Sequence, residues 1–303
     1  MLMIEVLHFK KEYNGFTAVP DLSFSVRQGE IYGLLGPNGA GKTTTLECLE
    51  GLRQPSGGKL LVAGVDPSTD SRRLTSLIGV QLQTSGLPAN ITPVEALRFF
   101  GAYHHVQPDF SLLERLGLGS KADVQYQQLS TGLQRRLALA MALAHRPPVL
   151  FLDEPTAGLD VESRVELHKL MLEEKDRGTT ILLATHDMAE AEELADRIAI
   201  LLRGELVAEG PPMEITATGA GLTKISVRTD AGCLSGQEHS LPAISQAVEK
   251  EGYQIFFSTD IGPTVSAIIN TIERAEDKLI DLRVERPSLE DRFLEITKNG
   301  GLS

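Results

Sequence analysis

The stretch from Gly36 to Thr44 has the composition of a phosphate-binding loop. It follows the apolar run 31–35 and precedes residues 45–49, which read as the first turns of a helix. Backbone N–H groups of such a turn, together with a helix N-terminus, attract anions. Lys42 is expected to reach the β- and γ-phosphates, and the Thr43 hydroxyl to bind Mg²⁺. The residues predicted to bind nucleotide are Gly36, Pro37, Asn38, Gly39, Ala40, Gly41, Lys42, Thr43 and Thr44.

A pair of carboxylates ends a second apolar run, at residues 148–154. A continuously apolar strand is typical of a parallel sheet that is buried on both faces, and ligands of such sheets bind at the carboxyl ends of the strands. Asp153 and Glu154 fall at that end. One carboxylate can hold Mg²⁺ and the other can orient an attacking water. The alternative, a solvated Asp-Glu pair, is disfavoured beside a phosphate loop.

Three further positions are ambiguous when each is taken alone. His186 follows the apolar strand 179–184, where it is either a structural histidine or a contact to the γ-phosphate. Tyr13 lies upstream of the phosphate loop and either packs on the surface or stacks on an adenine ring. Ser130 and Gly132 open the helix that continues through 137–144, which suits either a plain N-cap or an anion site.

The elements that must position these residues alternate between strand and helix. Residues 1–35 read as short strands with hairpin turns, and residues 92–124 form a helical block that begins with an N-cap at Thr92. A turn-rich segment at 210–221 reads as a linker. Beyond it, strands near 224–228, 254–258 and 279–284 and helices near 241–250, 264–275 and 288–297 predict a small α/β module.

Composition narrows the functional classes. The chain has 303 residues, 42% apolar and 23% charged, which is typical of a globular protein with one or two domains. Its net charge of −12 and 5% aromatic content argue against a nucleic-acid surface. Cys48 and Cys233 have no metal-type spacing and are expected to be buried, reduced thiols of a cytoplasmic protein. No apolar run approaches the ~18 residues of a membrane-spanning helix.

Taken together and in order, these motifs resemble those of ABC-type ATPases. The resemblance covers residues 1–216 and rests on a Walker A motif, a Q-loop glutamine, a signature, a Walker B motif and a switch histidine. It implies an α/β P-loop NTPase of the ABC ATPase fold, with an N-terminal antiparallel β-subdomain and an inserted helical subdomain at about 84–145. A C-terminal α/β accessory domain is expected at 217–303. The motifs are 36–43, Gln83, 129–134, 149–154, 159–160 and His186.

The resemblance also assigns roles. It implies ATP and Mg²⁺ as ligands, with Thr43, Gln83 and Asp153 at the metal and Tyr13 on the adenine. It implies a catalytic set of Glu154, His186, Gln83 and Lys42, in which Glu154 polarises water. Ser130 and Gly132 would complete the ATP site of a second subunit in a head-to-tail homodimer, or in a dimer with a similar ATPase, and Asp160 would connect the two sites.

Two features depart from the family pattern or leave a choice. Thr131 and Leu133 stand where the signature usually has Gly and Gln, which leaves the turnover rate open. Gln81 competes with Gln83 for the Q-loop role, and Gln83 is preferred because it lies where the apolar strand changes to a polar loop.

The C-terminal stretch 282–294 resembles the tail of ATPases that serve ABC-2-type exporters of the daunorubicin-resistance type. This implies a separate membrane permease, a peripheral location on the cytoplasmic face of the cell membrane, and drug, lipid or glycan-type cargo. The helical block around 84–128 is expected to dock the permease. The alternative is a soluble ABC-type ATPase that acts on ribosomes or nucleic acid.

Overall fold

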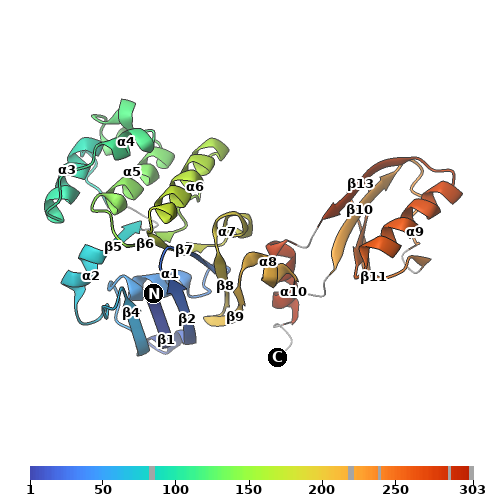
Figure 1. The fold of residues 1–303 in the computed structure, drawn as a ribbon, viewed down its shortest axis with the longest axis horizontal. Coiled ribbons are helices and arrows are strands. Elements are labelled where there is room, and N and C mark those ends of the chain that lie inside the picture. The colour runs from blue at the N-terminus through green and yellow to red at the C-terminus, as the bar shows by residue number, and fades with distance from the viewer. Residues whose placement is uncertain (82–85, 218–221, 238–239, 286–287, 300–303) are drawn as a thin grey trace. The chain divides into compact units, whose positions relative to one another are not determined.

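The computed structural model describes residues 1–81, 86–217, 222–237, 240–285 and 288–299. The chain forms two compact units, Met1–Pro211 and Pro212–Ser303 (Figure 1). Each unit has a sheet of its own. Within the described residues, no helix is long and apolar enough to cross a membrane.

The first unit is built on a nine-stranded sheet in the order β4-β1-β2-β9-β8-β3-β7-β6-β5. The strands β5, β6, β7, β3 and β8 pair in parallel, whereas β1 pairs with β2 and β4 in antiparallel fashion. The predicted antiparallel N-terminal part and parallel core are both confirmed. The strands are β1 Leu2–Tyr13, β2 Phe16–Arg27, β3 Ile31–Leu35, β4 Gly57–Val62, β5 Ile78–Gln81, β6 Val149–Asp153, β7 Thr180–Thr185, β8 Arg197–Leu202 and β9 Glu205–Gly210.

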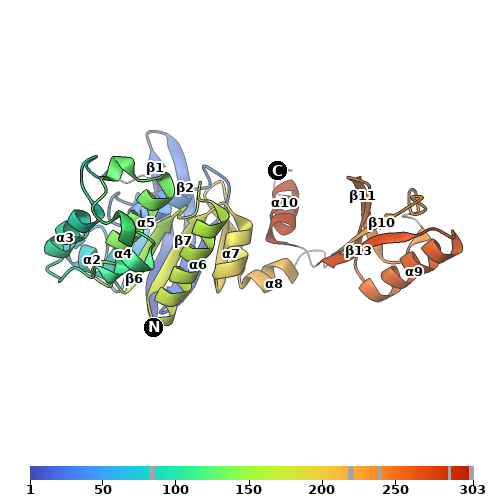
Figure 2. The ribbon, with the colours of Figure 1, turned by 90° about the horizontal axis from the view of Figure 1, so that it is seen from above.

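Helices cover both faces of the parallel strands. Alternate residues of β6 enter different cores: Phe151 packs with α1 and the antiparallel strands, whereas Leu150 and Leu152 pack with the helical block. Figures 1 and 2 show α3, α4 and α5 gathered on the β5 and β6 side of this unit. The helices are α1 Lys42–Leu49, α2 Ser71–Leu77, α3 Pro93–Tyr103, α4 Ser111–Arg115, α5 Thr131–Leu143, α6 Val161–Asp176 and α7 Met188–Leu194.

The predicted start of the helical block is confirmed. Thr92 caps α3 by accepting a hydrogen bond from the Glu95 backbone N–H, and the Glu95 side chain bonds back to the Thr92 backbone N–H. Two short 3₁₀ turns, Gly119–Lys121 and Tyr126–Gln128, lead from the block to α5.

The second unit has a four-stranded antiparallel sheet in the order β11-β12-β10-β13. The helix α9 covers one face, where Ile268 and Ile272 pack against Ile225, Val227 and Phe256 (Figure 1). The elements are α8 Pro212–Ala217, β10 Thr223–Thr229, β11 Ile244–Lys250, β12 Tyr253–Ser258, α9 Ile261–Arg274, β13 Leu279–Glu285 and α10 Leu289–Asn299.

Several sequence-based expectations are wrong in detail. The predicted helix at 241–250 is mainly the strand β11, which pairs with β12 across a tight turn at Glu251 and Gly252. Both turn residues have positive φ (52° and 80°), as a two-residue hairpin requires, and this turn overrides the helical spacing of apolar residues. The predicted linker at 210–221 contains the helix α8. Cys48 is buried, but Cys233 is only partly buried.

Candidate active site

The phosphate loop lies between the fully buried strand β3 and the helix α1. Gly36 and Gly41 have φ values of +154° and +96°. A Cβ atom on Gly36 would clash with the carbonyl oxygen of Leu201 on the neighbouring strand β8, so glycine is required there for close packing as well as for φ. Gly41 caps α1 in the left-handed conformation, which allows the loop to turn directly into the helix.

Lys42 is nearly buried, with 5% of its surface exposed. Its ammonium group donates to the carbonyl oxygens of Gly36, at 2.6 Å, and Pro37, at 3.2 Å. Burial lowers the pKa of Lys42, and the negative charges of Glu154 and Asp153 oppose that shift. The lysine thus lies across its own loop, close to both carboxylates that the sequence singled out.

Thr43 and Asp153 meet as the sequence predicts for a metal site. The Thr43 hydroxyl donates to Asp153 Oδ2 at 2.9 Å, which joins the start of α1 to the end of β6. Asp153 Oδ1 is buried and has no hydrogen-bond partner among the described residues, and burial raises the pKa of this carboxyl. A hydroxyl and a carboxylate with a free oxygen are ligands that Mg²⁺ accepts. The residues present therefore fit the ion.

Gln83 and Gln81 are the two candidates for the Q-loop glutamine, and the structure describes only Gln81. Gln83 lies outside the residues that the structure describes. Gln81 ends β5 beside Leu152 of β6, is 2% exposed, and has no partner for its buried side-chain oxygen among the described residues. Both glutamines therefore stay predictions for the metal.

Glu154 and His186 are brought together from the ends of neighbouring strands. His186 Nδ1 lies 2.8 Å from Glu154 Oε1. Glu154 has φ +48°, and its backbone N–H donates to the Ala184 carbonyl oxygen at 2.9 Å, so β7 fixes the turn that follows β6. The Glu154 side chain is 12% exposed and that of His186 is 55% exposed. The carboxylate is thus held in place while the imidazole faces outward.

Arg135 is a residue of this site that the sequence analysis missed. Its guanidinium donates to the backbone carbonyl oxygen of Glu154, and so links α5 to the turn that follows β6. The sequence held no local signal for this contact, because it depends on how α5 meets the end of β6.

Ser130 and Gly132 lie at the N-terminus of α5. Ser130 caps the helix by accepting a hydrogen bond from the Leu133 backbone N–H at 3.3 Å. A Cβ atom on Gly132 would lie 3.4 Å from Leu159. Leu159 directly precedes Asp160, the residue that caps α6. No hydrogen bond or ion pair within the described residues joins Ser130 or Gly132 to the loop at 36–44 of the same chain.

Tyr13 ends β1 and is half-buried. The Lys11 ammonium lies 4.7 Å from the centre of its ring and the Arg53 guanidinium 5.7 Å. Two positively charged side chains thus lie close to the Tyr13 ring. Their positions are compatible with surface packing and with an anionic nucleotide nearby. The adenine contact stays a prediction.

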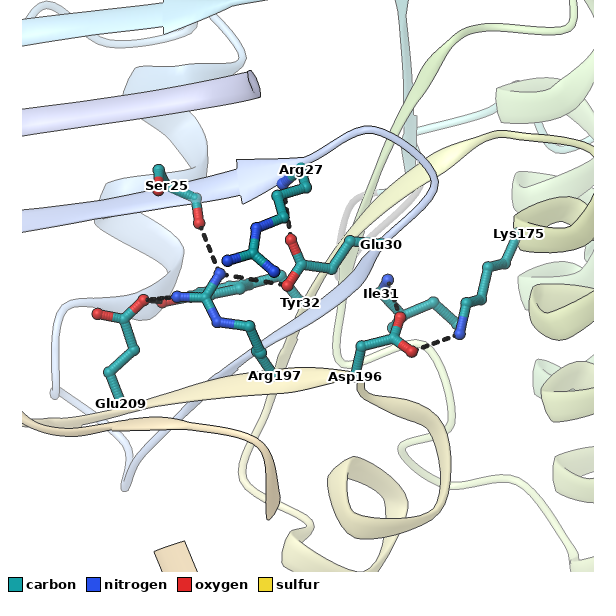
Figure 3. Close-up of polar contacts among 9 residues, drawn as sticks. All are labelled: Ser25, Arg27, Glu30, Ile31, Tyr32, Lys175, Asp196, Arg197 and Glu209. Carbon is teal, nitrogen blue, oxygen red and sulfur yellow. Dashed lines mark hydrogen bonds and ion pairs between the residues drawn. The ribbon is translucent and has the colours of Figure 1, made fainter. Parts of the chain in front are cut away.

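A polar network fixes the start of β3, the strand that leads to the phosphate loop (Figure 3). The buried Tyr32 hydroxyl donates to Glu209 at 2.8 Å, and burial raises the pKa of the phenol. Arg197 bridges Glu209, Glu30 and the Ser25 carbonyl oxygen. Strands β2, β3, β8 and β9 are therefore tied together by side chains.

The same region anchors α6. Asp196 accepts one hydrogen bond from the Ile31 backbone N–H, at 2.9 Å, and another from Lys175 near the end of α6 (Figure 3). The other end of α6 begins at its cap, Asp160. The helix is thus held at both ends.

A cluster of ion pairs, buried at His168 and Glu190 and exposed at Glu193, joins α6 to α7, the helix that follows His186. His168 is 4% exposed and lies 3.1 Å from Glu193 and 3.5 Å from Glu190, which is 2% exposed. Burial acts to lower the pKa of His168, but its contacts with Glu190 and Glu193 outweigh burial, and the pKa lies above its usual value.

This cluster predicts a pH-dependent stability. Because the pKa is higher in the folded state, the stabilisation is complete below the unfolded value of about 6.5 and is lost as the pH rises through the folded value. His168→Gln is expected to lower the free energy of unfolding by about 3 kcal/mol at about pH 6, and by less at about pH 9. Urea unfolding at both pH values measures this. Lys169→Gln, on the exposed side of α6, is the control, and an equal loss at both pH values would contradict the charged pair.

Comparison with known proteins agrees with this geometry. The sequence profile described as ABC transporter matches residues 19–157. A Nod factor export ATP-binding protein I from Ralstonia nicotianae is 36% identical over 97% of this chain and 94% of its own length. The daunorubicin resistance ATP-binding protein DrrA3 from Streptomyces coeruleorubidus is 34% identical over 95% of this chain and 93% of its own length.

The chain belongs to the ABC transporter family. It is an ABC-type ATPase, and the predicted recognition and fold are confirmed. The ATP-binding subunit of an ABC transporter aligns with 72% of this chain and 94% of its own, with a TM-score of 0.68 and 28% identity. A dimeric ATP-binding cassette bound to ADP and Pi aligns with 69% of this chain and 98% of its own, with a TM-score of 0.64 and 26% identity.

Proposed function

We propose that this ABC ATPase binds Mg-ATP between two subunits and hydrolyses it to drive export through a separate membrane permease. The observation that carries the proposal is the pairing of Glu154 with His186 beside the Thr43–Asp153 contact. Both contacts lie at the carboxyl ends of parallel strands, where ligands of such sheets bind. A carboxylate, an imidazole and a metal-type ligand pair next to a phosphate loop are the parts that phosphoryl transfer needs.

Each side chain has a separate task in this proposal. Lys42 and the amides of loop 36–44 bind the phosphates, and Tyr13 stacks on the adenine. Thr43, Asp153 and Gln83 would hold Mg²⁺, which neutralises phosphate charge when bound. Glu154 polarises the attacking water and His186 contacts the γ-phosphate. Arg135 keeps the Glu154 backbone in position through its carbonyl oxygen.

The second half of the site comes from another subunit in this proposal. Ser130 and Gly132 present a helix N-terminus, which favours an anion, yet no contact joins them to their own chain's loop within the described residues. Placing them on the phosphates of a partner's ATP makes binding a clamp between subunits. The dimeric cassette among the structural neighbours supports this arrangement.

The partner is proposed to be an ABC-2-type permease, and the chain to lie on the cytoplasmic face of the membrane. Two named relatives are a Nod factor export protein and a daunorubicin resistance protein, and we infer drug, lipid or glycan-type cargo here. A soluble ABC ATPase of ribosomes or nucleic acid is the weaker candidate. The −12 charge offers little attraction to phosphate backbones.

A groove of about 280 Å³ in the first unit supplies a docking surface for that permease. It lies between the helical block and the core, and two of its apolar lining residues are exposed: Leu52 is 59% and Tyr103 61% exposed. Exposed apolar side chains gathered in one place mark interaction sites. The lining residues are Glu50, Leu52, Thr75, Ile78, Gly79, Val80, Phe100, Tyr103, His104, Met141, Ala142 and His145.

The experiment that tests the proposal is purification of the tagged chain from detergent-solubilised membranes. The wild type is expected to recover one integral membrane protein, and Leu52→Asp to lower its yield at least about tenfold, because a charge at the apolar groove must be desolvated. Leu7→Asp, an exposed position on β1, is the matched control. Recovery with ribosomes and no membrane protein would favour the soluble alternative.

A further inference from the structure

Glu50 is an unusual residue for the docking groove. It caps the C-terminal end of α1, lines the groove, and is 6% exposed. Its Oε2 is buried and has no hydrogen-bond partner among the described residues. Buried carboxylates are normally paired or hydrogen-bonded, because an unpaired one loses its hydration without compensation.

Among the residues that the structure describes, the lining of the groove offers Glu50 no positive charge. Its lining contains no lysine or arginine. Arg53, the cation nearest in sequence, is paired with Glu47 and lies over the Tyr13 ring. No lysine or arginine among the described residues of the lining is therefore available to pair with the Glu50 Oε2 atom.

The histidines of the groove do not replace such a cation. His104 and His145 stack in parallel with their ring centres 3.8 Å apart. Burial, and then the neighbouring His104, lower the pKa of His145 to about 4, and burial also lowers the pKa of His104. Both rings are thus neutral near pH 7 and serve as flat, largely apolar walls.

We propose that the permease segment that docks in this groove carries one basic side chain, and that this side chain pairs with Glu50. The inference rests on the proposed function, since it specifies the partner of that docking surface. That segment also presents apolar side chains to Leu52, Phe100 and Tyr103, which line the groove. Its arginine or lysine enters the groove to meet the carboxylate, since a charge pair in an apolar setting requires both members.

The position of Glu50 also connects the groove to the ATP site. Thr43, in the first turn of α1, contacts Asp153, and Glu50 follows the last residue of the same helix. Burial raises the pKa of Glu50 to about 8, and the negative charge of Asp153 contributes to that rise. A cation that docks at Glu50 would therefore lie at the C-terminal end of the helix whose first turn contacts Asp153.

The test uses Glu50→Gln, which keeps the shape and removes the acidic group, with Glu162→Gln at an exposed position of α6 as the control. In the chain alone near pH 7, Glu50→Gln should leave the melting temperature unchanged, because burial raises the pKa of Glu50 to about 8 and the amide then replaces a mainly neutral carboxyl group. A lower melting temperature would show that Glu50 has a partner within its own chain, and would overturn the inference.

In the complex with the membrane protein recovered by the wild type, Glu50→Gln should weaken binding by about 30-fold, as loss of one partner of a buried charge pair does. A photo-crosslinker at position 50 should then mark a segment with a lysine or arginine. Exchange of the charges, with Glu50→Arg and that base replaced by glutamate, should restore binding. Failure of the exchange, or a marked segment without a base, would overturn the inference.

The two proposals fail in different ways. If Leu52→Asp dissociates the complex and Glu50→Gln does not, the groove is the docking site but the proposed pairing of Glu50 with a basic side chain is wrong. If neither variant weakens binding of the membrane protein and the crosslinker at position 50 does not mark it, the groove is not its docking site. Both proposals are then wrong.

Discussion

Replacement of Glu154 by glutamine is expected to lower steady-state ATP hydrolysis by about 1000-fold, while ATP affinity changes less than about threefold. Glutamine fills the same space but cannot take up a proton or polarise the attacking water as a carboxylate does. The Glu154 side chain is 12% exposed and held at 2.8 Å from His186, so its geometry should survive the change. The proposed contacts of ATP with Lys42 and loop 36–44 should also be retained.

Phosphate release and the binding of a fluorescent ATP analogue measure the two quantities separately. If hydrolysis releases the proposed clamp between subunits, the variant should also accumulate an ATP-bound dimer, visible by size-exclusion chromatography. Glu162→Gln, on the exposed first turn of α6, is the matched control. Hydrolysis at the wild-type rate in the Glu154 variant would show that another group orients the water.

Residues that are adjacent in sequence were predictable because their chemistry is local. The loop from Gly36 to Lys42 needs only the conformations of its own glycines and the helix that follows. The carboxylates Asp153 and Glu154 are placed by the end of one apolar strand. These positions therefore follow from patterns of fewer than about ten residues.

Contacts between distant segments were not predictable in the same way. The Arg135 contact to the Glu154 carbonyl oxygen depends on how α5 meets β6. The hydrogen bond of Tyr32 to Glu209 spans 177 positions, and a tyrosine in an apolar strand gives no sign of its partner. Glu50, in the apolar stretch at the end of α1, looks like an ordinary exposed carboxylate until its burial is known.

The misread strand β11 has a specific physical cause. Its apolar residues fit a helix as well as a strand, and short segments of this kind are ambiguous by periodicity. The turn at Glu251 and Gly252 and pairing with β12 decide the matter. A tight two-residue turn followed by the largely apolar and aromatic strand 253–258 was the available signal.

Gly132→Asp is expected to lower ATP hydrolysis by at least about 100-fold while leaving ATP binding to the isolated subunit unchanged, because its carboxylate would face the γ-phosphate held by a partner subunit. The chain itself has room for the change, since a Cβ atom at this position would lie 3.4 Å from Leu159, an ordinary contact. Gly132→Ala is the control for shape without charge. Phosphate release and nucleotide binding measure the effect.

Mixing two inactive variants tests the half-site directly. Lys42→Ala damages the loop and Gly132→Asp damages the signature, so each homodimer has no intact site. A mixed dimer has one site that joins the intact loop of one subunit to the intact signature of the other. Mixing should therefore recover up to about a quarter of wild-type hydrolysis, since half of the dimers are mixed and one site in two is intact. If signature and loop worked within one chain, no mixture would recover activity, and the assignment of Ser130 and Gly132 to the partner's ATP would be wrong.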